Sequence, residues 1–225
     1  ATLALSPRLP DLTLKDPRNL TALHVETPRR KGGKPAWTKA PRHAAPAAHG
    51  GPAKPLSVGF YVSWDANSRA SLAQHVGQLD VVSPQWIALV GDKGDIDVTS
   101  DPQASALIAA APNKPAVMPL VHNSANAAFD AGQAEAILSD PTARTALIDR
   151  LVDLAQARGF GGYIFDLENL TPRAAKLYPG FLAQARAALA KTDRQAWVTA
   201  PFDGEDWPLA AMQEASDALV LMAYD

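Results

Sequence analysis

Two carboxylates separated by one residue are the side chains of this sequence best placed to carry out chemistry. Asp166 and Glu168 end an apolar, β-forming run that begins at Gly161. Because side chains alternate along a strand, both carboxylates point the same way, about 7 Å apart. Their mutual repulsion and partial burial raise the pKa of one of them, and an acid that stays protonated near neutral pH can protonate a glycosidic oxygen. The alternative is a pair of solvent-facing acids that cap the next helix.

Strands and helices alternate along the chain on both sides of this pair. The strands are continuous apolar runs, which is typical of parallel strands buried on both faces. Asp-Pro pairs and a glycine supply helix starts and a helix stop. Predicted strands cover residues 57–62, 85–90, 116–121, 161–167, 196–201 and 218–224. Predicted helices cover residues 68–79, 101–111, 140–158, 171–191 (interrupted or kinked at Pro179) and 207–215.

Two architectures fit this alternation, a doubly wound open sheet and a (β/α)8 TIM-type barrel. The chain contains neither a G-x-G-x-x-G nor a G-x-x-x-x-G-K-[ST] motif, as a nucleotide-binding open sheet usually would. A barrel gathers its chemistry at the carboxyl ends of its strands. Those ends carry polar and aromatic residues, namely Trp64, Asp65, His122, Asn123, Asp166, Glu168, Asp203 and Asp225. The sequence therefore favours an α/β barrel of about six β/α units, which we expect to be a C-terminally incomplete piece of a longer chain.

The chain divides by composition near residue 55. Residues 1–55 hold ten Lys and Arg against three acidic residues, and nine of the nineteen prolines. Such a segment cannot bury enough apolar surface to offset its chain entropy, so it is predicted to be a flexible linker. A basic strip that lies on an anionic membrane surface or glycan is the other interpretation. Residues 56–225 form the predicted barrel domain and carry a net charge of −9.

Composition excludes several classes of function. The chain has no cysteine, which rules out disulfides, thiolate metal sites and a cysteine nucleophile. Its histidines lack chelating spacing, so we expect no metal and no cofactor. The acidic barrel segment, and a basic segment with Trp37 as its single aromatic residue, argue against nucleic-acid binding. No apolar run approaches the roughly 20 residues of a membrane-spanning helix.

The run 161–168 resembles a signature of glycoside hydrolase family 18, the chitinase-like barrels. The fourth strand of that family carries Asp-Gly-x-Asp-x-Asp-x-Glu. Gly162, Asp166 and Glu168 match it, whereas Gly161 and Ile164 stand where the family has Asp.

Two further motifs agree with this resemblance in order and spacing. The run 221–225 is similar to the Met-x-Tyr-Asp of the family's sixth strand, and the run from Gly59 to Trp64 is similar to its first strand. Together the three motifs span residues 57–225, about three-quarters of the chain. The resemblance implies a chitinase-like barrel.

For the site, the resemblance implies a mechanism in which the substrate's own N-acetyl group is the nucleophile. Glu168 would protonate the leaving oxygen and later activate water. Asp166 would hold the acetamido N–H, and Tyr224 would donate to the acetamide oxygen. Asp225 would bind a sugar hydroxyl or the acetamide region. Because Ile164 cannot share a proton with Asp166 as the family's middle Asp does, slow or absent turnover is an open alternative.

Side chains on or just past the predicted strands complete the expected substrate-binding set. Aromatic faces stack on sugar rings, and carboxamides bond to hydroxyl groups. The set comprises Trp64, Tyr61, Asn123 and Asn169, while His122 is either a further substrate contact or part of a loop pair.

The resemblance is nearest to a subgroup found in large bacterial envelope proteins. There the chitinase-like domain follows a Pro- and basic-rich linker and is fused to a polysaccharide deacetylase and a family-2 glycosyltransferase. It implies a periplasmic or extracytoplasmic location, with a membrane tether through a missing N-terminal segment, and a polysaccharide or oligosaccharide as substrate. Three hypotheses stay open: a glycosidase acting on β-linked N-acetylglucosamine polymers, a non-catalytic domain that binds or guides a glycan beside a synthase, and a scaffold for neighbouring domains.

Overall fold

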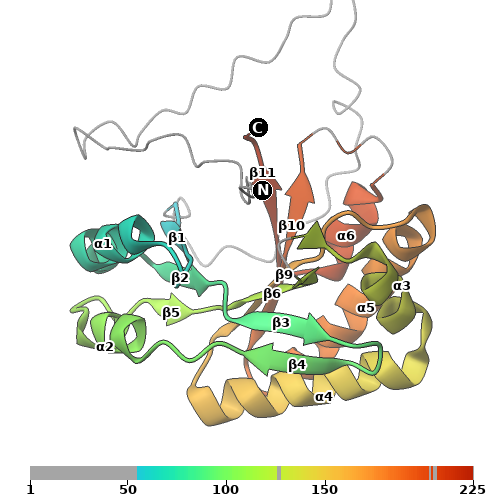
Figure 1. The fold of residues 1–225 in the computed structure, drawn as a ribbon, viewed down its shortest axis with the longest axis horizontal. Coiled ribbons are helices and arrows are strands. Elements are labelled where there is room, and N and C mark those ends of the chain that lie inside the picture. The colour runs from blue at the N-terminus through green and yellow to red at the C-terminus, as the bar shows by residue number, and fades with distance from the viewer. Residues whose placement is uncertain (1–54, 126–127, 203, 205–206, 225) are drawn as a thin grey trace, which may run out of the picture. The chain divides into compact units, whose positions relative to one another are not determined.

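The computed structural model describes residues 55–125, 128–202, 204 and 207–224. The predicted linker, apart from Pro55, lies outside these residues. Helices and strands alternate along the described chain (Figure 1). The helices are α1 (Ala66–His75), the short η3 (Val76–Gln78), α2 (Pro102–Ala110), α3 (Ala131–Ser139), α4 (Pro141–Arg158), α5 (Pro172–Ala190) and α6 (Leu209–Ala215). The strands are β1 (Val58–Tyr61), β2 (Val81–Pro84), β3 (Ile87–Val90), β4 (Asp95–Val98), β5 (Ala116–Val117), β6 (Leu120–His122), β7 (Ser124–Ala125), β8 (Ala128–Phe129), β9 (Gly162–Asp166), β10 (Gln195–Pro201) and β11 (Ala218–Met222).

The parallel strands follow one another in chain order, as in a β/α barrel. β1 pairs with β2 and β2 with β5, while β3, β6, β9, β10 and β11 pair in succession. Backbone bonds join the two sets, since the Gly161 N–H donates to the Val117 carbonyl at 2.9 Å. In Figure 1 the strands lie between α1 and α2 on one side and α3, α5 and α6 on the other. The predicted barrel-type fold is confirmed.

The central strands β2, β6, β9 and β10 bury both of their faces, as their continuous apolar composition predicts. One face packs on the helices and includes Tyr163, Phe165 and Val198. The other face forms a separate interior cluster of Val81, Met118, Leu120, Ile164 and Trp197, with Val58, Ala218 and Val220 packed against it. Because side chains alternate, the residue two positions after Ile164, namely Asp166, lies on this interior face just beyond the apolar cluster.

Local capping chemistry sets the helix boundaries. The Asp101 carboxylate accepts the Ala104 N–H at 2.9 Å at the start of α2. At the start of α4 the Asp140 carboxylate accepts the Thr142 N–H. Both helices have proline at the first helical position, as predicted. Gly159 ends α4 in the left-handed conformation, with φ of 70°.

The structure departs from the predicted elements in several places. The expected strand 85–90 begins at Ile87, and β2 precedes it as a separate strand that pairs with β1. The expected strand 116–121 is divided into β5 and β6. The antiparallel edge strand β4, the hairpin β7–β8 and α3 were not predicted. Helix α5 continues past Pro179 without interruption.

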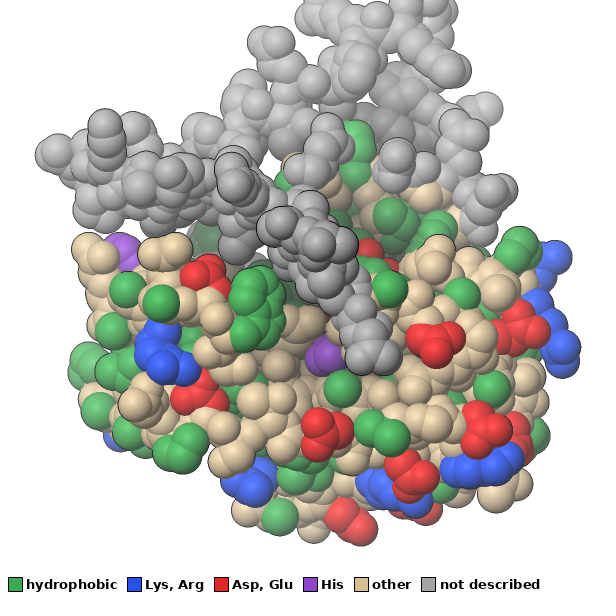
Figure 2. Space-filling model, viewed as in Figure 1, with side chains coloured by type: hydrophobic (Ala, Val, Ile, Leu, Met, Phe, Trp, Pro, Cys, Tyr) green, Lys and Arg blue, Asp and Glu red, His purple; other side chains and the backbone are tan. Residues whose placement is uncertain are grey.

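Charged side chains of both signs alternate along the lower edge of the face shown in Figure 2, where α4 lies in the same view. Arg150 of α4 pairs with Asp95 of β4 at 2.7 Å. None of the helices in the described ranges combines the length and the apolar character that crossing a membrane requires.

Candidate active site

Asp166 is the last residue of β9 and is buried, with 8% of its surface exposed. A neighbouring strand supplies its hydrogen bond, because the Thr199 hydroxyl of β10 donates to Asp166 Oδ1 at 2.7 Å. Burial raises the pKa of Asp166, and the bond from Thr199 opposes part of that rise. Thr199 therefore favours the ionised form of this carboxyl, against the larger effect of burial.

Glu168 lies two residues beyond Asp166 and is partly buried. Burial, and to a lesser extent the charge of Asp166, raises the pKa of Glu168 to about 7. A carboxyl with this pKa can both give and take a proton near neutral pH, which is the property required of a general acid and base. Both carboxyls therefore have raised pKa values, and burial is the larger cause for each of them.

Tyr224 follows β11 and is 45% exposed. Burial raises the pKa of its hydroxyl, and the negative charges of Asp166 and Glu168 raise it further. The phenol therefore lies within electrostatic reach of both carboxylates and stays protonated as a hydrogen-bond donor. The three residues predicted to act in catalysis come together in the structure, whereas Asp225 lies outside the described residues.

Asn123, predicted as a substrate contact, has a different place. Its side chain is completely buried, and its carboxamide bonds on both sides to the backbone of Glu168, at 2.9 Å and 3.0 Å. Because no surface of the side chain is exposed, it holds the backbone of Glu168 and does not reach a ligand. A buried asparagine whose partner is 45 residues away in sequence could not be assigned from the residues alone.

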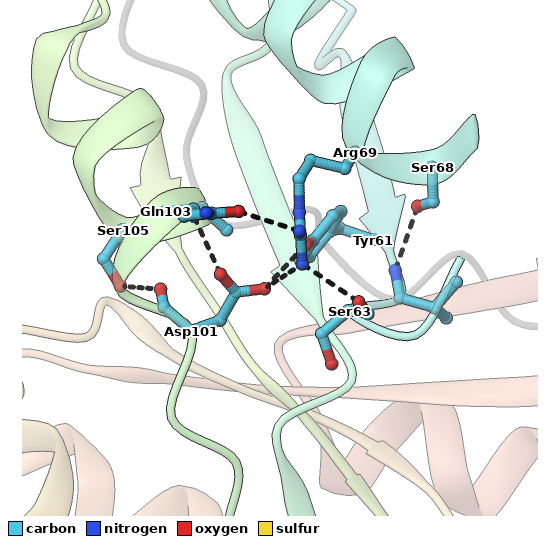
Figure 3. A network of polar contacts seen from close by, with 9 residues as sticks. Tyr61, Ser63, Ser68, Arg69, Asp101, Gln103 and Ser105 are labelled. Carbon is cyan, nitrogen blue, oxygen red and sulfur yellow. Dashed lines mark hydrogen bonds and ion pairs between the residues drawn. The ribbon is translucent and has the colours of Figure 1, made fainter. Parts of the chain in front are cut away.

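Tyr61 is also displaced from its predicted role in substrate binding. It is 1% exposed, and its hydroxyl donates to Asp101 Oδ2 at 2.6 Å. Arg69 of α1 contacts both groups (Figure 3). It forms an ion pair with Asp101 at 3.5 Å, and its Nε donates to the Tyr61 hydroxyl oxygen at 3.4 Å. Burial, followed by the bond to Asp101, raises the pKa of Tyr61. This network fastens β1, α1 and the start of α2 to one another on the helix side of the strand, away from the interior face.

The remaining predicted contacts, Trp64 and Asn169, follow β1 and β9. Trp64 is 65% exposed, which leaves its ring available for stacking on a sugar. Asn169 turns the chain directly after Glu168 with φ of 53°, a conformation that asparagine tolerates better than most residues.

Thr199 was not among the predicted site residues, and His122 was expected to be either a substrate contact or part of a loop pair. His122 pairs in register with Asp166, and its Nδ1 accepts the Ser124 N–H at 3.3 Å. Burial lowers the pKa of His122 to about 4, so the ring is neutral at neutral pH and carries its proton on Nε2. The sequence signal for Thr199 was a single hydroxyl in an otherwise apolar strand, on the same face as the interior residue Trp197.

Among the described residues, no three His, Asp or Glu side chains gather closely enough to hold a metal ion. The carboxyl and hydroxyl groups of the site can transfer protons, stabilise charge and form hydrogen bonds.

Solved structures of chitinases and of a spore cortex-lytic enzyme superpose on this chain. A chitinase from Chromobacterium violaceum ATCC 12472 superposes with a TM-score of 0.66 at 21% identity, over 76% of this chain and 56% of that one. The spore cortex-lytic enzyme SleL of Bacillus cereus gives 0.66 at 19% identity, over 76% and 41%. The chain has a chitinase-like fold.

Sequence comparison adds a match over a shorter part of the chain. No family model matches the chain. The sporulation-specific glycosylase YdhD of Bacillus subtilis (strain 168) is 35% identical over 69 residues, which are 31% of this chain and 16% of that protein. The chain therefore spans a small part of this curated relative and about half of the solved chitinase.

Proposed function

We propose that the chitinase-like domain is a glycoside hydrolase that cleaves β-linked N-acetylglucosamine-containing polysaccharide. The observation that carries this proposal is Glu168, whose pKa of about 7 suits a general acid and base at the carboxyl end of a barrel strand. The chitinase and glycosylase names of the similar proteins support the reaction class and a polysaccharide substrate.

In the proposed reaction, Glu168 gives its proton to the glycosidic oxygen as the bond from that oxygen to C1 breaks. The carbonyl oxygen of the substrate's N-acetyl group forms the new bond to C1 from the opposite face, so that an oxazolinium ion results. Glu168, now ionised, takes a proton from the water that adds to C1 and opens this ring. Retention of configuration follows from the two successive displacements.

Two neighbours would orient the acetamido group. Asp166 accepts the acetamide N–H and its negative charge stabilises the developing cation; among the described residues only Thr199 donates to this carboxyl, through Oδ1. Tyr224 donates its hydroxyl to the acetamide oxygen and aligns it with C1. Such alignment lowers the barrier because the entropy of positioning is lost on binding and not in the reaction step.

The direct test is incubation of the full chain with N-acetylglucosamine oligomers, with the products identified by mass. We expect shorter oligomers from the wild type and none from Glu168→Gln, which keeps the shape of the side chain but not its proton chemistry. Intact oligomers with both proteins would contradict a hydrolase.

A second function, glycan binding without cleavage, is favoured by Ile164. This residue replaces the acid that the family pairs with Asp166 and lies in the apolar interior between Leu120 and Trp197. The exposed ring of Trp64 would serve a binding domain equally well. An oligosaccharide-induced rise in melting temperature without any cleaved product would identify this function.

The proposal extends to the context of the domain. Residues 1–55 would form a linker and residues 56–225 the barrel domain. The spore cortex-lytic and sporulation-specific names of two similar proteins support an extracytoplasmic role. A membrane tether and fusion to deacetylase and glycosyltransferase domains rest on the sequence resemblance; protease protection of the full-length protein in intact cells tests the location.

A further inference from the structure

The sheet ends before the residue on which the chemistry depends. The last register pair between β6 and β9 joins His122 to Asp166. Glu168 lies two residues further on, outside any strand, and Asn169 turns the chain away with φ of 53°. For Glu168 to point to the same side as Asp166, the backbone must stay extended over these two residues without a strand partner.

The carboxamide of Asn123 takes the place of the missing partner. The Glu168 N–H donates to Asn123 Oδ1 at 2.9 Å, and Asn123 Nδ2 donates to the Glu168 carbonyl at 3.0 Å. A carboxamide offers an acceptor and a donor in one plane, as a peptide group does. Asn123 follows β6 directly, so its side chain continues the pairing of β6 with the chain beyond β9.

The same side chain is anchored from a second direction. Asn123 Nδ2 also donates to the Asp130 carbonyl at 3.1 Å, and the Asp130 N–H donates to the Asn123 carbonyl at 2.9 Å. These bonds close the segment that contains β7 and β8. Since Asn123 has no exposed surface, water cannot replace any of these bonds without local opening.

We propose that Asn123 is the positioning residue that fixes the backbone of Glu168, and with it the direction of the catalytic carboxyl. This inference rests on the proposed function for its effect on turnover. It assigns to Asn123 no contact with the substrate, so its removal should lower kcat and leave KM nearly unchanged. A misplacement of about 1 Å in a reacting group can cost on the order of 100-fold in rate.

The test compares Asn123→Ala and Asn123→Asp in the full chain. Asn113→Ala is the matched control, since Asn113 also donates its carboxamide to backbone carbonyls, of Val76 and Leu79, outside the site. Two quantities are measured: hydrogen exchange of individual amides by NMR, and kcat and KM on N-acetylglucosamine oligomers as a function of pH.

We expect Asn123→Ala to accelerate exchange of the Glu168 amide by more than about tenfold, while the amides of β9 keep their protection. We expect kcat to fall roughly 10- to 100-fold with KM changed less than about threefold. The high-pH limb of kcat should also move to lower pH, because a loosened Glu168 becomes more hydrated and its pKa falls from about 7. Asn123→Asp keeps the acceptor for the Glu168 N–H but puts an oxygen against the carbonyls of Glu168 and Asp130. We therefore expect the Glu168 amide to lose less protection in this variant than in the alanine variant, a change that is measured against the wild type even if the alanine variant does not fold.

Each alternative result decides the matter. Unchanged exchange at Glu168 in Asn123→Ala, or loss of protection in Asn123→Asp equal to that in the alanine variant, overturns the proposal. An unchanged kcat in Asn123→Ala, in a protein that Glu168→Gln inactivates, overturns it too. If the wild type cleaves nothing, the proposed function fails, and amide exchange alone then shows whether Asn123 fixes Glu168.

Discussion

The replacement of Glu168 by glutamine should stabilise the protein at high pH while it abolishes turnover. The pKa of Glu168 rises from 4.5 to about 7 on folding, chiefly because of burial. Between these values the unfolded chain releases a proton that the folded chain retains. The unfolded state then binds fewer protons, so the free energy of unfolding falls as pH rises. The full cost is present above about pH 7 and is absent below about pH 4.5.

The size of the effect follows from the same shift. At about 1.4 kcal/mol per pKa unit, it corresponds to about 3 kcal/mol, which solvent screening of a partly exposed carboxyl reduces to about 1–2 kcal/mol. Glutamine carries no charge at any pH and avoids this cost. We therefore expect Glu168→Gln to be more stable than the wild type by about 1–2 kcal/mol near pH 8. Near pH 4.5 the difference should be about a few tenths of a kcal/mol.

Urea unfolding of both proteins at the two pH values measures this difference. For a chain of this size, each kcal/mol also raises the melting temperature by about 2–4 °C. Glu214→Gln is the matched control, because it makes the same change on the exposed surface of α6. A difference between wild type and Glu168→Gln that does not depend on pH would refute the raised pKa, and with it the basis for assigning Glu168 as the general acid.

Three further substitutions test other parts of the structure. Thr199→Val removes the bond to Asp166, and a bond to a charged group contributes about 1.5–3 kcal/mol; the low-pH limb of kcat/KM should move up by about 1–2 pH units. Gly162→Ala would put Cβ 2.0 Å from the Gln195 carbonyl oxygen at φ of 146°, so we expect a loss above about 4 kcal/mol in urea unfolding, or no folded protein. Tyr61→Phe should cost about 1–2 kcal/mol of stability and leave kcat/KM unchanged; a large rise in KM would restore Tyr61 as a substrate contact.

The sequence predicted the elements whose signals are local. The Asp-Pro starts of α2 and α4 depend on contacts within one turn, and the apolar runs of β9 and β10 depend on burial that any parallel sheet provides. The strand β4 could not be predicted in this way. Its sequence alternates between acidic and apolar residues, and it becomes a strand through antiparallel pairing with β3 at the edge of the sheet.

For the candidate site, too, the sequence predicted the features that depend on local signals. Strand alternation placed Asp166 and Glu168 on one face, and a resemblance added Tyr224. Strand alternation could not show which face of β1 points to the interior, since both faces of the strand are apolar. Tyr61 lies on the helix side, where it contacts Asp101. Whether a polar side chain meets a ligand or the backbone depends on partners far away in the sequence, as for Asn123.

Ile164 changes how Asp166 is supported. It is flanked in register by Leu120 and Trp197, so the described residues of the layer beneath Asp166 are apolar and include no second acid with which to share a proton. The Thr199 hydroxyl takes over the hydrogen bond, and a hydroxyl can donate to a carboxylate or accept from a carboxylic acid. The bond can therefore persist whichever protonation state Asp166 has during a reaction cycle. If the proposed reaction takes place, we expect it not to require an acid at position 164, because Thr199 of the neighbouring strand already forms a hydrogen bond with Asp166.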